Sequence, residues 1–124
     1  MSRSSKAKGR RLQNFVRDIL KEAFPSLRDD DIKSQTMGMT GEDIVLSPAA
    51  QDLIPYSFEC KNQERLNIWS SLEQAEDNSK ERVPILIIKR NHTIPFAVMP
   101  LDNFIDLVKE KEWKIYYAKN AGIK

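Results

Sequence analysis

Two acidic residues and one lysine in the middle of the chain have the types and the spacing of a catalytic cluster. Glu59 and Lys61 are two residues apart in the alternating segment Tyr56–Asn62, so in a β-strand their side chains point to the same side. Asp43 begins another β-branched run sixteen residues earlier, and neighbouring antiparallel strands would bring the two carboxylates together. Because Glu-x-Lys alone is common on exposed strands, it is Asp43 that favours a functional site.

Two carboxylates that share a site repel each other unless a cation lies between them, and hard oxygen ligands select Mg²⁺ or Mn²⁺. Such an ion polarises a phosphate ester and lowers the pKa of a bound water. Lys61 would orient or activate that water and offset negative charge in the transition state. The backbone carbonyl of Cys60 is a natural further ligand, and its thiol is expected to point into the core. The cluster therefore predicts metal-dependent phosphodiester hydrolysis.

The surrounding sequence predicts an α/β fold in which helices flank a central mixed sheet. Apolar residues at three-and-four spacing predict helices from Gly9 to Phe24, from Leu66 to about Asn78, and after Pro100. The almost wholly apolar segment Val83–Ile88 is expected in the middle of the sheet, forming a hairpin with the strand that follows it. Strands are expected at Ile32–Met37, Asp43–Ser47, Tyr56–Asn62, Val83–Ile88, Ile94–Met99 and Trp113–Ala118.

Length and composition limit the class of protein. The chain has 124 residues, of which 40% are hydrophobic and 31% charged, so we expect one domain over 1–124, with a basic flexible arm at 1–8 and a loose tail at 119–124. The chain has a single cysteine, which excludes an internal disulfide. With a single histidine as well, it has too few ligands for a structural zinc site. The sequence shows neither a membrane-spanning run nor a secretory signal, which favours the cytoplasm.

Two further surfaces are suggested by the sequence. Basic residues crowd the start of the chain without an acid among them: Lys6, Lys8, Arg10 and Arg11. They form either a solvated, disordered terminus or an arm that neutralises DNA phosphates. For Arg65 the same two interpretations remain: an exposed side chain in solvent, or a contact with a DNA phosphate. The apolar content of residues 94–108 and 113–117 is large for so small a domain, which indicates that part of it is buried in a dimer interface.

The order of these motifs resembles the PD-(D/E)xK nuclease core. Gly-Glu-Asp-Ile-Val at 41–45, Phe-Glu-Cys-Lys-Asn at 58–62 and a helix carrying Gln74 are similar to the archaeal-type Holliday junction resolvases, which also have relatives in phages. The resemblance spans about residues 8–88. It implies a restriction-endonuclease-like fold in which Asp43 and Glu59 bind the metal. It also implies that Lys61 is the catalytic lysine and that Gln74 is the polar residue of the following helix.

The resemblance further implies a homodimer that binds a four-way (Holliday) DNA junction and cuts two of its strands symmetrically with Mg²⁺, for which Mn²⁺ would substitute. It favours the phosphate-binding interpretation of the basic arm, and it implies no membrane and no small-molecule cofactor. Two alternatives stay open. One is a nuclease of the same fold with a flap, mismatch or duplex target, and the other is a non-catalytic DNA-binding protein that has kept the fold.

Two positions depart from the family pattern. Glu42 stands where the family has a proline that takes no part in the chemistry. Gln13 stands four residues after Gly9, where the resolvases carry a glutamate; its oxygen can still bind a metal, but without charge. Either Gln13 is a neutral ligand, or Glu22 or Glu42 takes part, or metal affinity is weaker. We expect the first.

Overall fold

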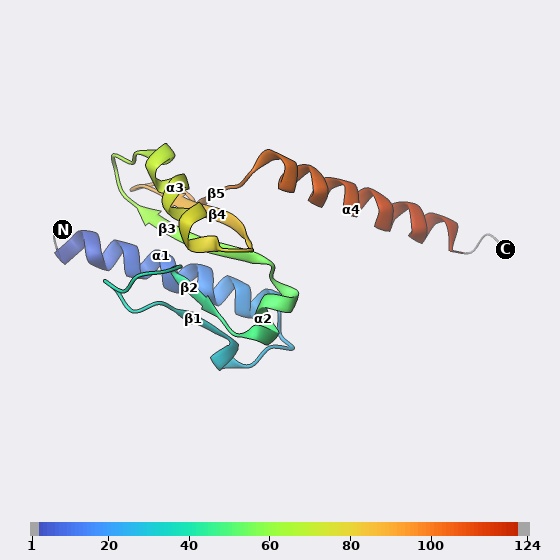
Figure 1. Ribbon diagram of the computed structural model, residues 1–124, viewed down its shortest axis with the longest axis horizontal. Helices are drawn as coiled ribbons and strands as arrows, with labels where there is room; N and C mark the ends of the chain where they lie inside the picture. Colours follow the sequence, from blue (N-terminus) through green and yellow to red (C-terminus); the bar gives the residue numbers. More distant parts are fainter. Residues whose placement is uncertain (1–2, 122–124) are drawn as a thin grey trace.

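Helices and strands alternate along residues 3–121, the part of the chain that the structure, a computed structural model, describes (Figure 1). The elements are α1 (Arg3–Ala23), a 3-10 turn (Asp29–Asp31), β1 (Ile32–Ser34), β2 (Ile44–Leu46), α2 (Pro48–Leu53), β3 (Tyr56–Asn62), α3 (Ile68–Ser79), β4 (Val83–Lys89), β5 (Phe96–Val98) and α4 (Leu101–Asn120). The fold is α/β, as the sequence predicts.

The strands form two sheets. β1 and β2 are an antiparallel pair, while β4 is the central strand of a mixed sheet, parallel to β3 and antiparallel to β5. Because parallel neighbours need a long crossover connection, the chain passes through α3 between β3 and β4, and α3 contacts both strands. The predicted central position of Val83–Ile88 and its hairpin with the next strand are both confirmed.

The hydrophobic core lies between α1 and the two sheets. Leu12 and Val16, four residues apart on one face of α1, are buried against β1, β2 and β3. The buried apolar residues of the core are Leu12, Val16, Ile32, Ile44, Leu46, Ala50, Ile54, Phe58, Cys60 and Ile85. Since Leu12 fixes the rotation of α1, the next residue, Gln13, is turned inward as well and is only 6% exposed.

The expectation of a flexible basic arm at 1–8 was wrong for the residues that the structure describes. Arg3–Lys8 belong to α1, which begins at Arg3 and not at Gly9. The apolar pattern from which the helix was predicted starts only at Leu12. The polar segment before Leu12 therefore gave no signal that the helix begins at Arg3. Serine, alanine, lysine and arginine nevertheless all tolerate a helix, and one glycine costs it only about 1 kcal/mol. Residues 1 and 2 lie outside the described range.

The C-terminal expectations were also wrong. Trp113–Ala118 is helical and not a strand, because α4 runs unbroken to Asn120. The alternation of aromatic and polar residues suits a strand only where a neighbouring strand can pair with it. None of the described strands pairs with this segment. Lys119 and Asn120 form the last turn of α4, not a loose tail, and residues 122–124 lie outside the described range. None of the described helices combines the length and the apolar character that a membrane crossing requires.

The short helix α2 was not predicted. Pro48, interpreted from sequence as the end of a strand, occupies the first turn of the helix, where its missing N–H is not needed. The hydroxyl of Ser47 caps this turn by accepting a hydrogen bond from the backbone N–H of Ala50 (3.1 Å). The segment thus holds both an end-of-strand signal and a start-of-helix signal.

Candidate active site

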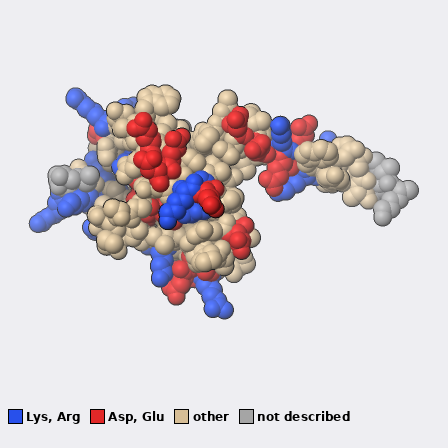
Figure 2. Space-filling model, viewed as in Figure 1, with Lys and Arg blue, Asp and Glu red and all other residues tan. Residues whose placement is uncertain are grey.

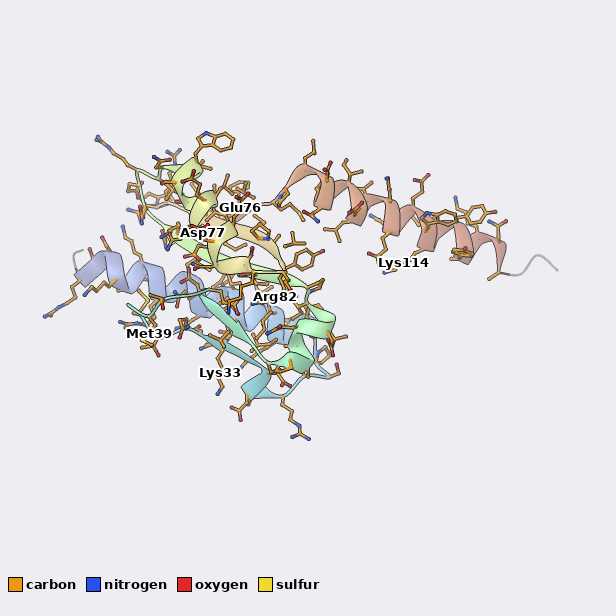
Figure 3. The ribbon with its side chains drawn as sticks, in the orientation of Figure 1. Lys33, Met39, Glu76, Asp77, Arg82 and Lys114 are labelled. Atoms are coloured by element: carbon orange, nitrogen blue, oxygen red, sulfur yellow. The ribbon has the colours of Figure 1, made fainter. Side chains whose placement is uncertain are left out.

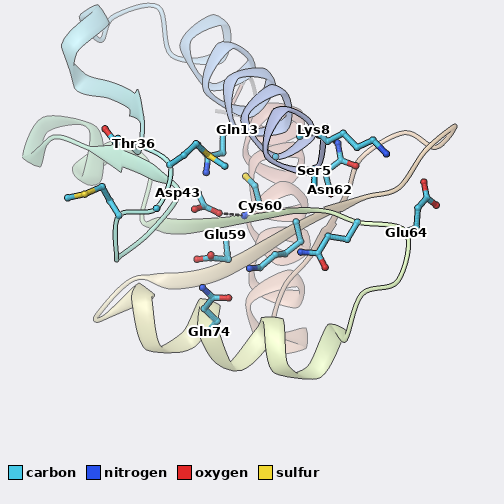
Figure 4. A pocket seen from close by; sticks show the side chains of 16 residues that line it. Ser5, Lys8, Gln13, Thr36, Asp43, Glu59, Cys60, Asn62, Glu64 and Gln74 are labelled. Carbon is cyan, nitrogen blue, oxygen red and sulfur yellow. Dashed lines mark hydrogen bonds between the residues drawn. The ribbon is translucent and has the colours of Figure 1, made fainter. Parts of the chain in front are cut away.

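One pocket of about 570 Å³ collects the residues expected to do chemistry (Figure 4). Its walls come from α1, the loop before β2, the end of β3, and α3. The predicted site residues that line it are Gln13, Asp43, Glu59, Cys60, Lys61 and Gln74. Four segments of the chain therefore converge on one cavity.

Asp43 is held in place by the backbone of β3. Its N–H donates to the carbonyl oxygen of Phe58 (3.0 Å), and its carboxylate Oδ2 accepts a hydrogen bond from the N–H of Cys60 (2.6 Å). Burial raises the pKa of Asp43. The hydrogen bond from Cys60, a hydrogen bond with Glu59 and the charge of Lys61 act in the opposite direction.

Glu59 is the more deeply buried carboxylate, with 3% of its surface exposed. Burial and the nearby negative charge of Asp43 raise its pKa to about 7, although Asn78 and Lys61 favour the charged form. Oε2 of Glu59 accepts a hydrogen bond from Nδ2 of Asn78 (3.1 Å). The hydrogen bond between the two carboxyl groups raises the pKa of Glu59 and lowers that of Asp43, so Glu59 is the carboxyl group that keeps a proton more readily.

Gln13 completes the buried cluster. A hydrogen bond from its side chain lowers the pKa of Asp43. Its own Oε1 is buried without a hydrogen-bond partner, and no other buried side-chain nitrogen or oxygen of residues 3–121 lacks one. An unsatisfied buried acceptor costs about 1–3 kcal/mol. Figure 4 shows the Gln13 side chain pointing toward Asp43 in the pocket that also holds Glu59, so the site combines two acidic groups with an unused acceptor.

The two acidic alternatives to Gln13 lie elsewhere. Glu22 is exposed near the end of α1. Glu42 forms an ion pair with Arg82 (Oε2 to Nη2, 2.5 Å) and accepts a hydrogen bond from the Ser57 hydroxyl (2.9 Å). Neither lines the pocket. In the part of the chain that the structure describes, no three His, Cys, Asp or Glu side chains are grouped closely enough to hold a metal ion.

The other lining residues differ in exposure. Lys61 is half-buried, and its charge favours the ionised form of both carboxyl groups. Gln74 is exposed on α3 but faces the pocket across from β3 (Figure 4). The thiol of Cys60 is part of the hydrophobic core, as predicted, and burial raises its pKa, so it is not a nucleophile.

Only one of the predicted DNA-contacting residues shares the pocket. Lys8 lines it, and its carbonyl oxygen accepts a hydrogen bond from Nδ2 of Asn62 (3.2 Å), which ties α1 to β3. Lys6, Arg10 and Arg11 are exposed along α1, and Arg65 is exposed in the loop after β3. Of the residues predicted to contact DNA, Lys8 thus joins Lys61 at the pocket, and the others are exposed outside its lining.

Sequence reasoning missed Asn78, which fixes the orientation of the Glu59 carboxylate. The signal was present in the sequence, because Asn78 lies four residues after Gln74 and therefore on the same face of α3. When one polar residue of a helix faces a buried carboxylate, the residue four positions later lies on the same face and can hydrogen-bond to that carboxylate.

Comparison of the chain with models of protein families, with curated proteins and with solved structures gave no match. The geometry of the pocket and the resemblance of the motifs are therefore the basis for a functional assignment.

Proposed function

We propose that this protein is a metal-dependent DNA endonuclease of the PD-(D/E)xK type with a restriction-endonuclease-like fold. The observation that carries the proposal is the pair of carboxylates, Glu59 buried and Asp43 half-buried, in one pocket with Lys61 and with Gln13, whose amide oxygen has no partner. Two carboxyl groups that lie together and away from water are costly in a folded protein unless a ligand compensates for them. A functional site explains the cost.

The donor set fits a hard divalent cation. Asp43, Glu59 and Gln13 offer oxygen atoms, and an ion among them would neutralise the carboxylates and satisfy the buried amide oxygen. The backbone carbonyl of Cys60 is the further ligand proposed from the sequence. When bound, Mg²⁺ or Mn²⁺ supplies a Lewis acid for the phosphate and lowers the pKa of water.

The residues of the chain then have separate roles. The N–H of Cys60 and the amide of Asn78 hold the carboxylates of Asp43 and Glu59 in fixed orientations. Lys61 donates to the scissile phosphate or to the attacking water and offsets the negative charge that builds up in the transition state. Gln74, on the opposite wall, is placed to hydrogen-bond to the same water or phosphate.

The substrate that we propose is branched DNA, in particular a four-way junction. Lys8 at the pocket, together with Lys6, Arg10 and Arg11 on α1 and Arg65 on the loop, provides positive charge for phosphate groups. The similarity of the motifs to Holliday junction resolvases favours the junction over a flap, a mismatch or a duplex. Symmetric cutting of two strands needs two active sites, so the working unit is a homodimer.

The first test is cleavage of a labelled four-way junction beside a linear duplex of matched sequence, with Mg²⁺ or with EDTA. We expect cutting that requires the metal, is much faster on the junction, and is absent in Asp43→Asn, because that variant removes one of the two charges that hold the ion. Equal rates on both substrates would leave a nuclease with another target. Tight junction binding without cutting would leave a non-catalytic DNA-binding protein.

Mn²⁺ affinity tests the role of Gln13. Gln13→Glu adds a third negative charge to the cluster, so we expect Mn²⁺ to bind at least about tenfold tighter, and Gln13→Ala to bind it more weakly. Titration calorimetry measures both. Glu22→Gln, on the exposed end of α1, is the matched control and should bind like wild type. Unchanged affinity in both Gln13 variants, with loss of binding in Glu42→Gln, would assign the third ligand to Glu42.

A further inference from the structure

The last helix extends away from the rest of the protein (Figure 1). No residue of α4, all of which lies in the described range, is buried, although the helix has 20 residues. Its large apolar side chains are 40–71% exposed: Leu101, Phe104, Ile105, Leu107, Val108, Trp113, Ile115, Tyr116 and Tyr117. Isolated helices are marginal in water and soluble monomers rarely expose so much apolar surface, so α4 requires a packing partner.

An apolar cleft lies at the base of α4, between α3 and the end of β5. It has a volume of about 410 Å³ and is lined by Trp69, Leu72, Pro84, Val98, Met99 and Pro100, with Glu73 and Glu76 among its polar lining. Trp69 is 79% exposed. Figure 2 shows acidic side chains gathered over the region of α3, and Figure 3 places Glu76 and Asp77 there. The cleft is thus apolar inside and acidic at its edge.

The charges of α4 are divided along its length. Asp102 and Asp106 are the only charged residues of its first two turns, Lys114 and Lys119 are the only ones after Trp113, and the segment between them alternates in sign. Lys114 pairs with Glu110 on the same helix (3.2 Å), an exposed contact of the kind that contributes little. With four acids and four lysines α4 has no net charge, which does not suit binding along a DNA backbone.

We infer that α4 is an arm that two copies of this chain exchange, so that the α4 helix of each copy packs against the other copy. The two arms run antiparallel across a two-fold axis, and the aromatic second half of each arm covers the cleft between α3 and β5 of the other copy. The inference specifies the interface of the homodimer in the proposed function, but it does not depend on nuclease activity.

Antiparallel packing satisfies both the charges and the apolar surfaces. It places the acidic half of each arm beside the basic half of the other, and a two-fold axis makes this contact twice. Because α4 starts next to the cleft, the second half of the other arm arrives there, bringing Lys114 and Lys119 of the partner subunit to Glu73 and Glu76. Trp113 and Tyr117, whose rings stack at 5.5 Å, form the kind of aromatic cluster that is enriched at interfaces.

Sedimentation equilibrium of the full chain, in EDTA and without DNA, tests the arm. We expect a dimer that Lys114→Glu with Lys119→Glu weakens about tenfold, because two attractive pairs become repulsive. Glu73→Lys with Glu76→Lys should weaken it similarly, and the chain carrying all four changes should regain much of the affinity. Lys33→Glu, an exposed position on β1, is the matched control. A monomeric protein, or a dimer whose affinity is unchanged in all these charge variants, would overturn the inference.

Cross-linking locates the contact. One preparation carries Glu76→Cys and the other Lys114→Cys, while the native Cys60 is buried and does not react. After mixing, a short bis-maleimide should join the two chains into a covalent dimer, whereas Lys33→Cys mixed with Lys114→Cys should not be joined. Absence of the first product in a dimeric sample would show that the dimer uses another surface. Both experiments omit DNA and metal. A negative result in them would therefore count against the α4 interface and not against the proposed nuclease activity.

Discussion

Lys61→Ala is expected to slow junction cleavage by at least about a hundredfold while leaving folding and Mn²⁺ binding close to wild type. The side chain is half-buried in the pocket beside the carboxylates, so it can stabilise charge that develops in the transition state, but it is not a metal ligand. Single-turnover cleavage with enzyme in excess measures the chemical step directly.

Lys33→Ala is the control for Lys61, because Lys33 is an exposed lysine that pairs only loosely with Asp30 (3.8 Å). Thermal unfolding and Mn²⁺ titration on both variants separate a lost catalytic group from a damaged fold. A Lys61→Ala protein that folds, binds Mn²⁺ and cuts at the wild-type rate would remove the lysine from the mechanism.

Metal-free protein is expected to lose stability as pH rises from about 4.5 to about 7, and Glu59→Gln is expected to remove most of that loss. The pKa of Glu59 is raised from 4.5 to about 7 in the folded protein. Below 4.5 the carboxyl group is protonated in both states and costs nothing. Between pH 4.5 and about 7 the unfolded chain gives up this proton while the folded protein keeps it, so the free energy of unfolding falls across this interval by roughly 3 kcal/mol and then levels off. The raised pKa of Asp43 acts in the same direction.

Urea unfolding in EDTA, on both sides of this interval, measures the effect. Glutamine keeps an oxygen that can accept the hydrogen bond from Asn78, so Glu59→Gln removes the charge with little change of shape. Asp102→Asn, at an exposed position on α4, is the control. Wild-type stability that does not fall with pH would show that the carboxyl groups are ionised at little cost. Adding Mg²⁺ should restore the stability at high pH if the pair binds the ion.

The strands that carry the site were predictable because their signals are local. Alternation over Tyr56–Asn62 and the β-branched run after Asp43 gave both elements within a residue or two. The helix that carries Gln74 followed from apolar spacing. Their convergence was inferred from antiparallel pairing of the two strands, but β2 and β3 belong to separate sheets. Asp43 is instead brought to β3 by its own hydrogen bonds with the backbone of Phe58 and Cys60.

Other features depended on tertiary contacts that a sequence window does not contain. The pairing of Glu42 with Arg82, forty residues away, holds the Glu42 carboxylate outside the lining of the pocket. The helical state of Trp113–Ala118 depends on its neighbours, because the same alternation would have suited a strand beside another strand. The buried, unpartnered oxygen of Gln13 could be recognised only once α1 was placed against β2 and β3.

The bonds around the pocket span very different lengths of chain, and this has a consequence for the kinetics of folding. The bond between Cys60 and Asp43 closes a loop of 17 residues, whereas the bond between Asn62 and Lys8 joins groups 54 residues apart. Short loops close at less entropic cost, so we expect the two acids to meet before α1 docks over them. Their repulsion then acts in the folding transition state, where high pH would slow the refolding of metal-free chains.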